Sequence, residues 1–132
     1  MDTILFACVH NAGRSQMAAA WLNKLCDPKK ARAVSAGTEP GERVHPEVVH
    51  VMREEGIDLA EIKPQLLSTD LAQKASLLVT MGCGDACPFV PGLRKLDWPL
   101  QDPKGKPLQV VRKIRDEIRE RVIALAKQRN WL

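Results

Sequence analysis

The sequence predicts an α/β protein: a single three-layer domain in which a four-stranded parallel sheet carries helices on both faces. Two short segments, residues 3–7 and 77–81, are almost continuously apolar, which is typical of strands buried on both faces of a sheet. Segments with helical spacing of apolar residues alternate with the predicted strands. A length of 132 residues with 45% hydrophobic residues suits one compact core. We therefore expect residues 1–132 to form one domain.

The first strand and the first helix enclose a loop of polar and small residues. After the strand at 3–7, the apolar residues of 15–25 recur with helical spacing. Ser15 is a residue type well suited to the helix N-terminus. Pro28 follows Asp27 and is expected to end this helix, because the residue before a proline is disfavoured in helical conformation.

The middle of the chain continues the alternation. A second strand is predicted at residues 31–36, where Gly37 stops it. Pro46 is compatible with the first turn of a helix that runs to Gly56. A short helix at residues 69–74 is expected to lead into the apolar strand at 77–81.

The last predicted elements follow a loop rich in glycine and proline at residues 82–92. Residues 94–97 are expected to form a short fourth strand. The final helix is predicted at about residues 110–127, with apolar side chains mainly on one broad face. Those side chains belong to Val111, Ile114, Ile118, Val122, Ile123, Leu125 and Ala126.

Three loops are expected to meet at one edge of the sheet. In doubly wound parallel sheets, ligands bind at the carboxyl ends of the strands, near the point where the strand order reverses. The loops that follow the predicted strands there span residues 8–14, 82–92 and 99–105. We therefore expect the functional site to lie among these loops.

The strongest chemical signal is the pattern C-x5-R-S at residues 8–15, between a strand and a helix. Backbone amides of a tight loop at a helix N-terminus form a concave, positive site for a tetrahedral oxyanion. Arg14 adds a planar fork that can bind two oxygens. The helix dipole and Arg14 favour the thiolate form of Cys8, and Ser15 can donate a hydrogen bond to that sulfur. Cys8 is therefore the candidate nucleophile.

The rest of this loop is expected to wrap the oxyanion closely. Ala12 and Gly13 are small enough for a tight backbone path. The side chain of Asn11 can bond the amides of the loop, or Asn11 can occupy a left-handed backbone position, and the sequence leaves both open. His10 is expected to shape the pocket rather than bind metal. The candidate substrate-binding residues are Val9, His10, Asn11, Ala12, Gly13 and Arg14.

Charge and composition exclude several classes of function. The net charge is +4 and aromatic residues make up 4%, whereas a nucleic-acid site needs a dense basic patch with interleaved aromatics. No apolar run approaches the ~20 residues of a membrane span, and the N-terminus lacks the features of a signal peptide. We therefore expect a cytoplasmic protein that binds neither nucleic acid nor membrane.

Residues 8–18 (CVHNAGRSQMA) resemble the phosphate loop of the low-molecular-weight tyrosine phosphatases and of the arsenate reductases that share their fold. Further segments with this resemblance are 34–38, 78–81, 87–88, 97–98 and 102–105. The resemblance implies a four-stranded parallel sheet with helices on both faces. It also implies that Cys8 is the nucleophile, that Arg14 is the oxyanion ligand and that Asp102 is the general acid.

Two features favour a reductase over a phosphatase. The chain has no tyrosine, although the phosphatases carry one beside the Asp-Pro acid. Lys104-Gly105 follows Asp102-Pro103, which is closer to the D-P-A-G of the reductases. Cys83 and Cys87 lie in a loop on the same rim as Cys8. The resemblance then implies that Cys8 attacks arsenate and that a second thiol, Cys83 and then Cys87, releases arsenite. Thioredoxin is expected to reduce the resulting disulfide.

Three alternatives stay open at this stage. Thioredoxin-coupled reductases usually space the two later cysteines more widely than Cys83 and Cys87. A similar subgroup uses an external small thiol such as mycothiol, so that only Cys8 is needed. A low-molecular-weight phosphatase and a non-catalytic oxyanion-binding module are the others. If Cys83 and Cys87 act in turn, Gly82 and Gly84 allow the loop to move, which favours Cys83 as the first attacking thiol.

Other readings of the cysteines and histidines are weaker. Zinc needs four ligands, and no histidine has a spacing that would complete a site with Cys83 and Cys87. We therefore predict no metal and no cofactor. Cys26 is expected to be a core or near-surface residue. Asp102 precedes Pro103, and an aspartate at such a position can also serve only to form a turn.

Overall fold

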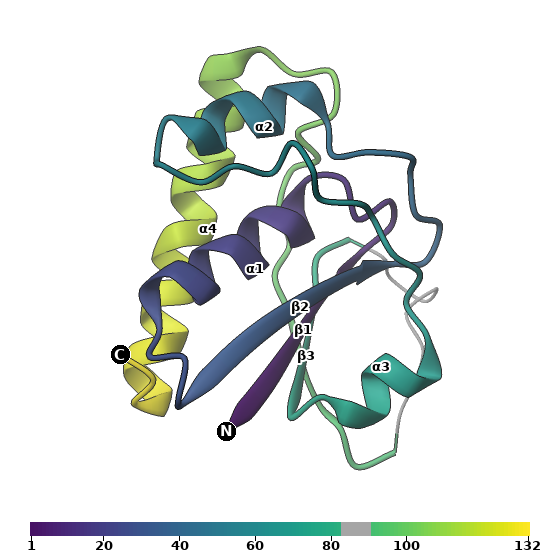
Figure 1. The fold of residues 1–132 in the computed structure, drawn as a ribbon, viewed down its shortest axis with the longest axis vertical. Helices are drawn as coiled ribbons and strands as arrows, with labels where there is room; N and C mark the ends of the chain where they lie inside the picture. The colour runs from purple at the N-terminus through teal and green to yellow at the C-terminus, as the bar shows by residue number, and fades with distance from the viewer. Residues whose placement is uncertain (83–90) are drawn as a thin grey trace.

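The computed structural model describes residues 1–82 and 91–132. Its four strands form one parallel sheet in the order β2-β1-β3-β4, and helices lie on both faces (Figure 1). The predicted fold class is therefore confirmed. The elements are β1 (Asp2–Cys8), α1 (Arg14–Leu25), β2 (Ala31–Gly37), α2 (Pro46–Arg53), α3 (Thr69–Lys74), β3 (Leu77–Thr80), β4 (Arg94–Asp97) and α4 (Leu108–Arg129).

Two helices differ from the sequence expectations, α2 and α4, and α2 ends at Arg53 rather than Gly56. The residue that caps α1 is Gly13, and Ser15 lies inside the first turn without capping it. Ser15 therefore lies at the N-terminal end of α1, as expected, and its hydroxyl is used elsewhere, as described below. Helix α4 is longer than predicted and ends at Arg129, and the capping residue Asn130 adopts the left-handed conformation with φ 59°. Asparagine tolerates that conformation better than most residues.

Strand β1 separates two hydrophobic clusters. Its alternate side chains Ile4, Phe6 and Cys8 belong to the larger cluster, whereas Leu5 and Ala7 belong to the smaller one. The larger cluster also contains residues of α1, α2 and α4, and the smaller one contains Ala72 of α3. Because successive side chains of a strand point to opposite faces, an apolar β1 buries both faces of the sheet.

The strand order reverses beside β1. Strand β2 pairs with one edge of β1, and β3 pairs with the other. Loops that leave the carboxyl ends of β1 and β3 therefore diverge at this point, which is where open α/β sheets bind ligands. The end of β1 is Cys8, so the fold places the candidate nucleophile at the switch point.

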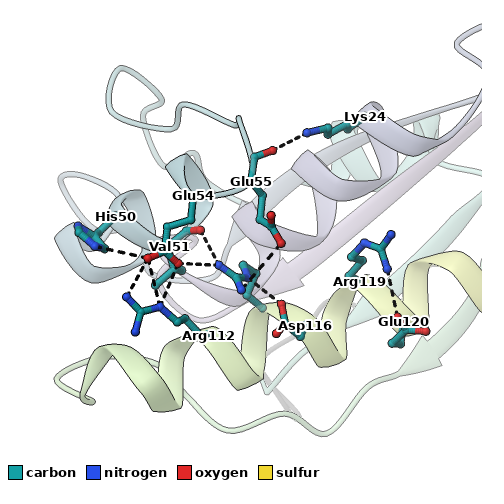
Figure 2. A network of polar contacts seen from close by, with 10 residues as sticks. Lys24, His50, Val51, Glu54, Glu55, Arg112, Asp116, Arg119 and Glu120 are labelled. Carbon is teal, nitrogen blue, oxygen red and sulfur yellow. Dashed lines mark hydrogen bonds and ion pairs between the residues drawn. The ribbon is translucent and has the colours of Figure 1, made fainter.

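Helices α2 and α4 are joined by a group of ion pairs at the surface (Figure 2). Arg112 binds both carboxylate oxygens of Glu54, at 2.8 Å from Nη2 to Oε2 and 3.0 Å from Nε to Oε1. The buried Arg115 donates to the Val51 carbonyl and to Glu54 Oε1, both at 2.9 Å. The hydrogen bond from Arg112, with a further one from Arg115, lowers the pKa of Glu54 to about 2 against the opposing effect of burial.

Within residues 1–82 and 91–132, no helix has the length and apolar character needed to cross a membrane.

Glu54→Gln is expected to destabilise the protein in a pH-dependent way. Since folding lowers the pKa of Glu54, its charged form stabilises the fold above the ordinary glutamate pKa, and that contribution disappears as the pH falls towards about 2. Urea unfolding should show a gap in free energy of unfolding between wild type and Glu54→Gln at pH 7. The gap should shrink from about pH 5 downward. Glu117→Gln is the control, because Glu117 forms only an exposed pair with Arg121. A gap that is independent of pH would contradict this account.

Candidate functional site

The loop between β1 and α1 lines a small hollow. The hollow is formed by Cys8, His10, Ala12, Gly13, Arg14, His45 and Asp102. The fold thus brings together six of the residues predicted from the sequence with one that was not. Val9 is not among the lining residues. Its side chain packs against the smaller hydrophobic cluster, so only its main chain contributes to the loop.

The sulfur of Cys8 is held by two neighbouring polar groups. Cys8 is only 3% exposed. The backbone amide of Asn11 donates to its Sγ at 3.2 Å, and the Ser15 hydroxyl lies 2.8 Å from the same atom. Hydrogen bonds to the charged form of a group favour that form, so this arrangement suits a thiolate nucleophile.

The neighbouring residues fix the direction of the Ser15 hydrogen bond. The backbone amide of Gln65 is a donor only, and it reaches Asn11 Oδ1 at 3.0 Å. The amide nitrogen of Asn11 must therefore be the group that faces Ser15, and it donates to Ser15 Oγ at 2.8 Å. Because that oxygen already accepts from Asn11, its own hydrogen is free to point at the sulfur of Cys8.

Asn11 occupies the left-handed position that the sequence allowed, whereas its side chain does not bond the amides of the loop. Its backbone adopts the left-handed conformation with φ 53°, and its fully buried side chain holds neighbouring groups. Its partners are the backbone amide of Gln65, the side-chain amide of Gln16 and the hydroxyl of Ser15. Left-handed backbone is uncommon for a residue other than glycine, and these contacts fix it here.

Arg14 is held from three sides beside the loop. Its Nη1 donates to the Leu100 carbonyl at 3.1 Å, and its Nη2 lies 3.8 Å from Asp102 Oδ2. Gly82, which follows β3, lies against the guanidinium: a Cβ at that position would be 2.5 Å from Nη1. The side chain of Arg14 is 12% exposed. The guanidinium is therefore held in place at the hollow.

Asp102 takes part in a turn and also faces the hollow. Its Oδ1 accepts from the backbone amide of Lys104 at 3.0 Å, which is the turn interaction expected for an Asp-Pro segment. Its Oδ2 faces Arg14 across the hollow, and half of the side chain is exposed. A carboxyl group at this position has access to solvent and to the site, as a proton donor requires.

His45 is the residue of the hollow that sequence reasoning missed. It precedes α2, and its backbone amide donates to the Ala12 carbonyl at 2.9 Å, which ties α2 to the loop. Burial lowers the pKa of His45, against Glu47 and Asp102, which raise it. In the sequence, His45 is distinguished only by its position before Pro46. That position indicates the start of a helix and not a functional site.

The other cysteines do not line the hollow in the part of the chain that the structure describes. Cys83 and Cys87 lie outside the described residues, so their expected roles stay predictions. Cys26 follows α1 and is buried, and burial raises the pKa of its thiol, as expected of a core cysteine.

Aromatic side chains are missing from the lining of the hollow as described. Phe6 and Trp98 pack against each other with ring centres 5.6 Å apart. Trp21 and Trp131 are also buried, and Phe89 lies outside the described residues. The described aromatic rings are therefore used for packing and do not form a wall beside Cys8.

Comparison with known proteins identifies the family. The Low molecular weight phosphotyrosine protein phosphatase family matches residues 3–130. The chain belongs to this family. The names of its relatives include different activities.

Three relatives illustrate this range. Arsenate reductase 1 of Bacillus cereus is 37% identical over 124 residues, which cover 91% of this chain and 90% of the relative. The structure of the thioredoxin-dependent arsenate reductase of Corynebacterium glutamicum aligns with a TM-score of 0.84 and 36% identity over 98% of this chain, which spans only 62% of that protein. The YwlE arginine phosphatase of Geobacillus stearothermophilus aligns with a TM-score of 0.80 and 28% identity, covering 97% of this chain and 92% of that one.

Gly82→Ala is expected to weaken oxyanion binding. An added Cβ would collide with the guanidinium of Arg14, and loss of a charge-assisted hydrogen bond should raise the Kd for phosphate or arsenate about tenfold or more. Isothermal titration calorimetry measures this change directly. Gly92→Ala is the control: it has a similar positive φ, but a Cβ there meets nothing within 4 Å. Equal affinities in the two variants would contradict the assigned position of Arg14.

Proposed function

We propose that this protein is a cytoplasmic arsenate reductase that uses Cys8 as its nucleophile. The observation that carries the proposal is the buried sulfur of Cys8, which accepts from the Asn11 amide and lies against the Ser15 hydroxyl in a hollow shared with Arg14. The reductases of Bacillus cereus and Corynebacterium glutamicum support the choice of substrate, since they match nearly the whole chain.

In the first step, the sulfur of Cys8 attacks the arsenic(V) atom of arsenate. Arg14 and the loop amides bind the arsenate oxygens and balance their negative charge. A sulfur–arsenic bond forms, and one arsenic–oxygen bond breaks. Asp102 supplies the proton that lets this oxygen leave as water, and no electron transfer has yet occurred.

In the second step, another thiolate attacks the sulfur of Cys8. The sulfur–arsenic bond breaks and its electron pair stays on arsenic, which becomes arsenic(III) and is released as arsenite. The two sulfurs lose two electrons and form a disulfide. We assign this thiol to Cys83, with Cys87 as the next attacking group and thioredoxin as the final reductant. A small-thiol couple such as mycothiol is the alternative reductant.

A phosphatase role toward aryl phosphates is supported less well. An aryl leaving group needs an apolar wall on which its ring can stack, and the described lining residues offer none. The chain also has no tyrosine. Weak hydrolysis of phosphate esters is expected as a side reaction, because the oxyanion loop and Asp102 serve both chemistries.

Arsenate-dependent NADPH oxidation tests the proposed function. Purified protein is assayed side by side with thioredoxin and thioredoxin reductase, and with a mycothiol–mycoredoxin couple. We expect turnover with at least one system, and none in either system with Cys8→Ser, because a serine hydroxyl is a far weaker nucleophile than a thiolate. Wild-type protein that cleaves phosphate esters rapidly but leaves arsenate unchanged would overturn the proposal in favour of a phosphatase.

Cys83→Ser and Cys87→Ser separate the internal relay from the small-thiol mechanism. If the relay operates, Cys83→Ser releases no arsenite with thioredoxin, and Cys87→Ser accumulates a Cys8–Cys83 disulfide detected by peptide mass spectrometry. Such a bond requires α-carbons to approach within about 4.4–6.8 Å. Full activity of both variants with mycothiol would show that only Cys8 is needed. Cys26→Ser is the control, because Cys26 is a buried core residue.

A further inference from the structure

Gln16 lies directly behind the oxyanion loop, on the first turn of α1. Its Nε2 donates to the Asn11 carbonyl and to Asn11 Oδ1, both at 3.0 Å. Gln16 is 5% exposed, and Asn11 is fully buried. It is not among the residues that line the hollow, so it acts through other groups.

We propose that Gln16 is a positioning residue, which holds Asn11 in the one orientation that lets Ser15 direct its hydrogen at the sulfur of Cys8. The inference deepens the proposed reductase function, because it concerns the same thiol. It rests on a chain of contacts: Gln16 to Asn11 at 3.0 Å, Asn11 to Ser15 at 2.8 Å, and Ser15 to Cys8 at 2.8 Å.

The orientation of the Asn11 side chain decides which way this chain of hydrogen bonds runs. With the amide nitrogen of Asn11 toward Ser15, the hydroxyl accepts from Asn11 and donates to sulfur. A half-turn about the last side-chain bond would present Oδ1 to Ser15 instead. The hydroxyl would then donate to Asn11, and Cys8 would lose one of its hydrogen-bond donors.

Two donors oppose that half-turn, because both need an oxygen at the Oδ1 position. One is the backbone amide of Gln65, and the other is Nε2 of Gln16. The first belongs to the main chain and stays in every variant. Gln16 is therefore the side chain whose removal weakens the orientation, and it also holds the carbonyl of the left-handed residue Asn11.

The side chain of Asn23 provides a matched control on the same helix. It donates to the Ala33 carbonyl at 3.0 Å and accepts from the Ala33 amide at 2.8 Å. Like Gln16, it makes two hydrogen bonds through one amide group. These bonds join α1 to β2 and do not involve Asn11, Ser15 or Cys8.

The reactivity of the Cys8 thiol tests the proposal without arsenate. Cys8 alkylation by iodoacetamide is followed by peptide mass spectrometry against pH in wild type, Gln16→Met, Gln16→Glu and Asn23→Leu. Methionine keeps the unbranched shape without a donor, and glutamate keeps the size but places a charge beside the Asn11 oxygens. Thermal melts followed by circular dichroism verify that each variant folds.

We expect both Gln16 variants to slow alkylation near pH 7 about threefold to tenfold, since a hydrogen bond to a charged group is weakened. The pH of half-maximal alkylation should move upward, whereas Asn23→Leu should leave it unchanged. In a Ser15→Ala background, Gln16→Met should change the rate less than about twofold, because residues that act through one another are not additive.

Two results would overturn the proposal: a wild-type alkylation profile in both Gln16 variants, or an effect of Gln16→Met that is undiminished in the Ser15→Ala background. The experiment is independent of turnover. Failure of the wild-type protein to reduce arsenate would refute the proposed function, and the alkylation profiles would still decide the role of Gln16.

Discussion

The rest of the site depends on one constraint: the sulfur of Cys8 is buried at the end of a core strand, and in the proposed function it must still react as an anion. A buried charge is costly unless hydrogen-bond donors and opposite charges compensate it. The loop after β1 provides this compensation, with the Asn11 amide at 3.2 Å and the Ser15 hydroxyl at 2.8 Å from the sulfur. Arg14 adds a positive charge in the same hollow. The positions of these donors therefore determine whether the site can perform its chemistry.

The fold supports the loop from both neighbouring strands. Gly37 at the end of β2 lies so close that a Cβ there would be 2.5 Å from the Val9 carbonyl and 2.8 Å from the Asn11 amide. On the other side, Gly82 after β3 leaves room for the guanidinium of Arg14. A parallel sheet with its order reversed at β1 places both glycines beside the loop. The close approach of three chain segments explains how a short loop keeps a fixed shape.

The sequence predicted the features that depend on local pattern. Apolar strands and helical spacing of apolar residues predicted the sheet and most helix positions. The C-x5-R-S pattern predicted that Cys8 and Arg14 belong to one loop between a strand and a helix. The contacts of His45, Gln65 and Gln16 were not predicted. His45 and Gln65 reach the loop from segments far along the chain, and Gln16 differs from an ordinary buried helix residue only through its bonds to Asn11. The contact between Ser15 and the sulfur of Cys8 was predicted, because both residues belong to the same local pattern. The roles of Cys83 and Cys87 remain predictions from the sequence.

The central claim is that Cys8 itself attacks arsenate and that thiols of this protein supply the electrons. A single turnover without added reductant tests it most directly: reduced protein receives one equivalent of arsenate, and arsenite and free thiols are counted together. With the internal relay, each arsenite released should consume two thiols and leave Cys83 and Cys87 in a disulfide. With the small-thiol mechanism, arsenite should appear only after that thiol is added, and Cys8→Ser should abolish it. Arsenite released only after a small thiol is added, or released by Cys8→Ser at the wild-type rate, would contradict the account.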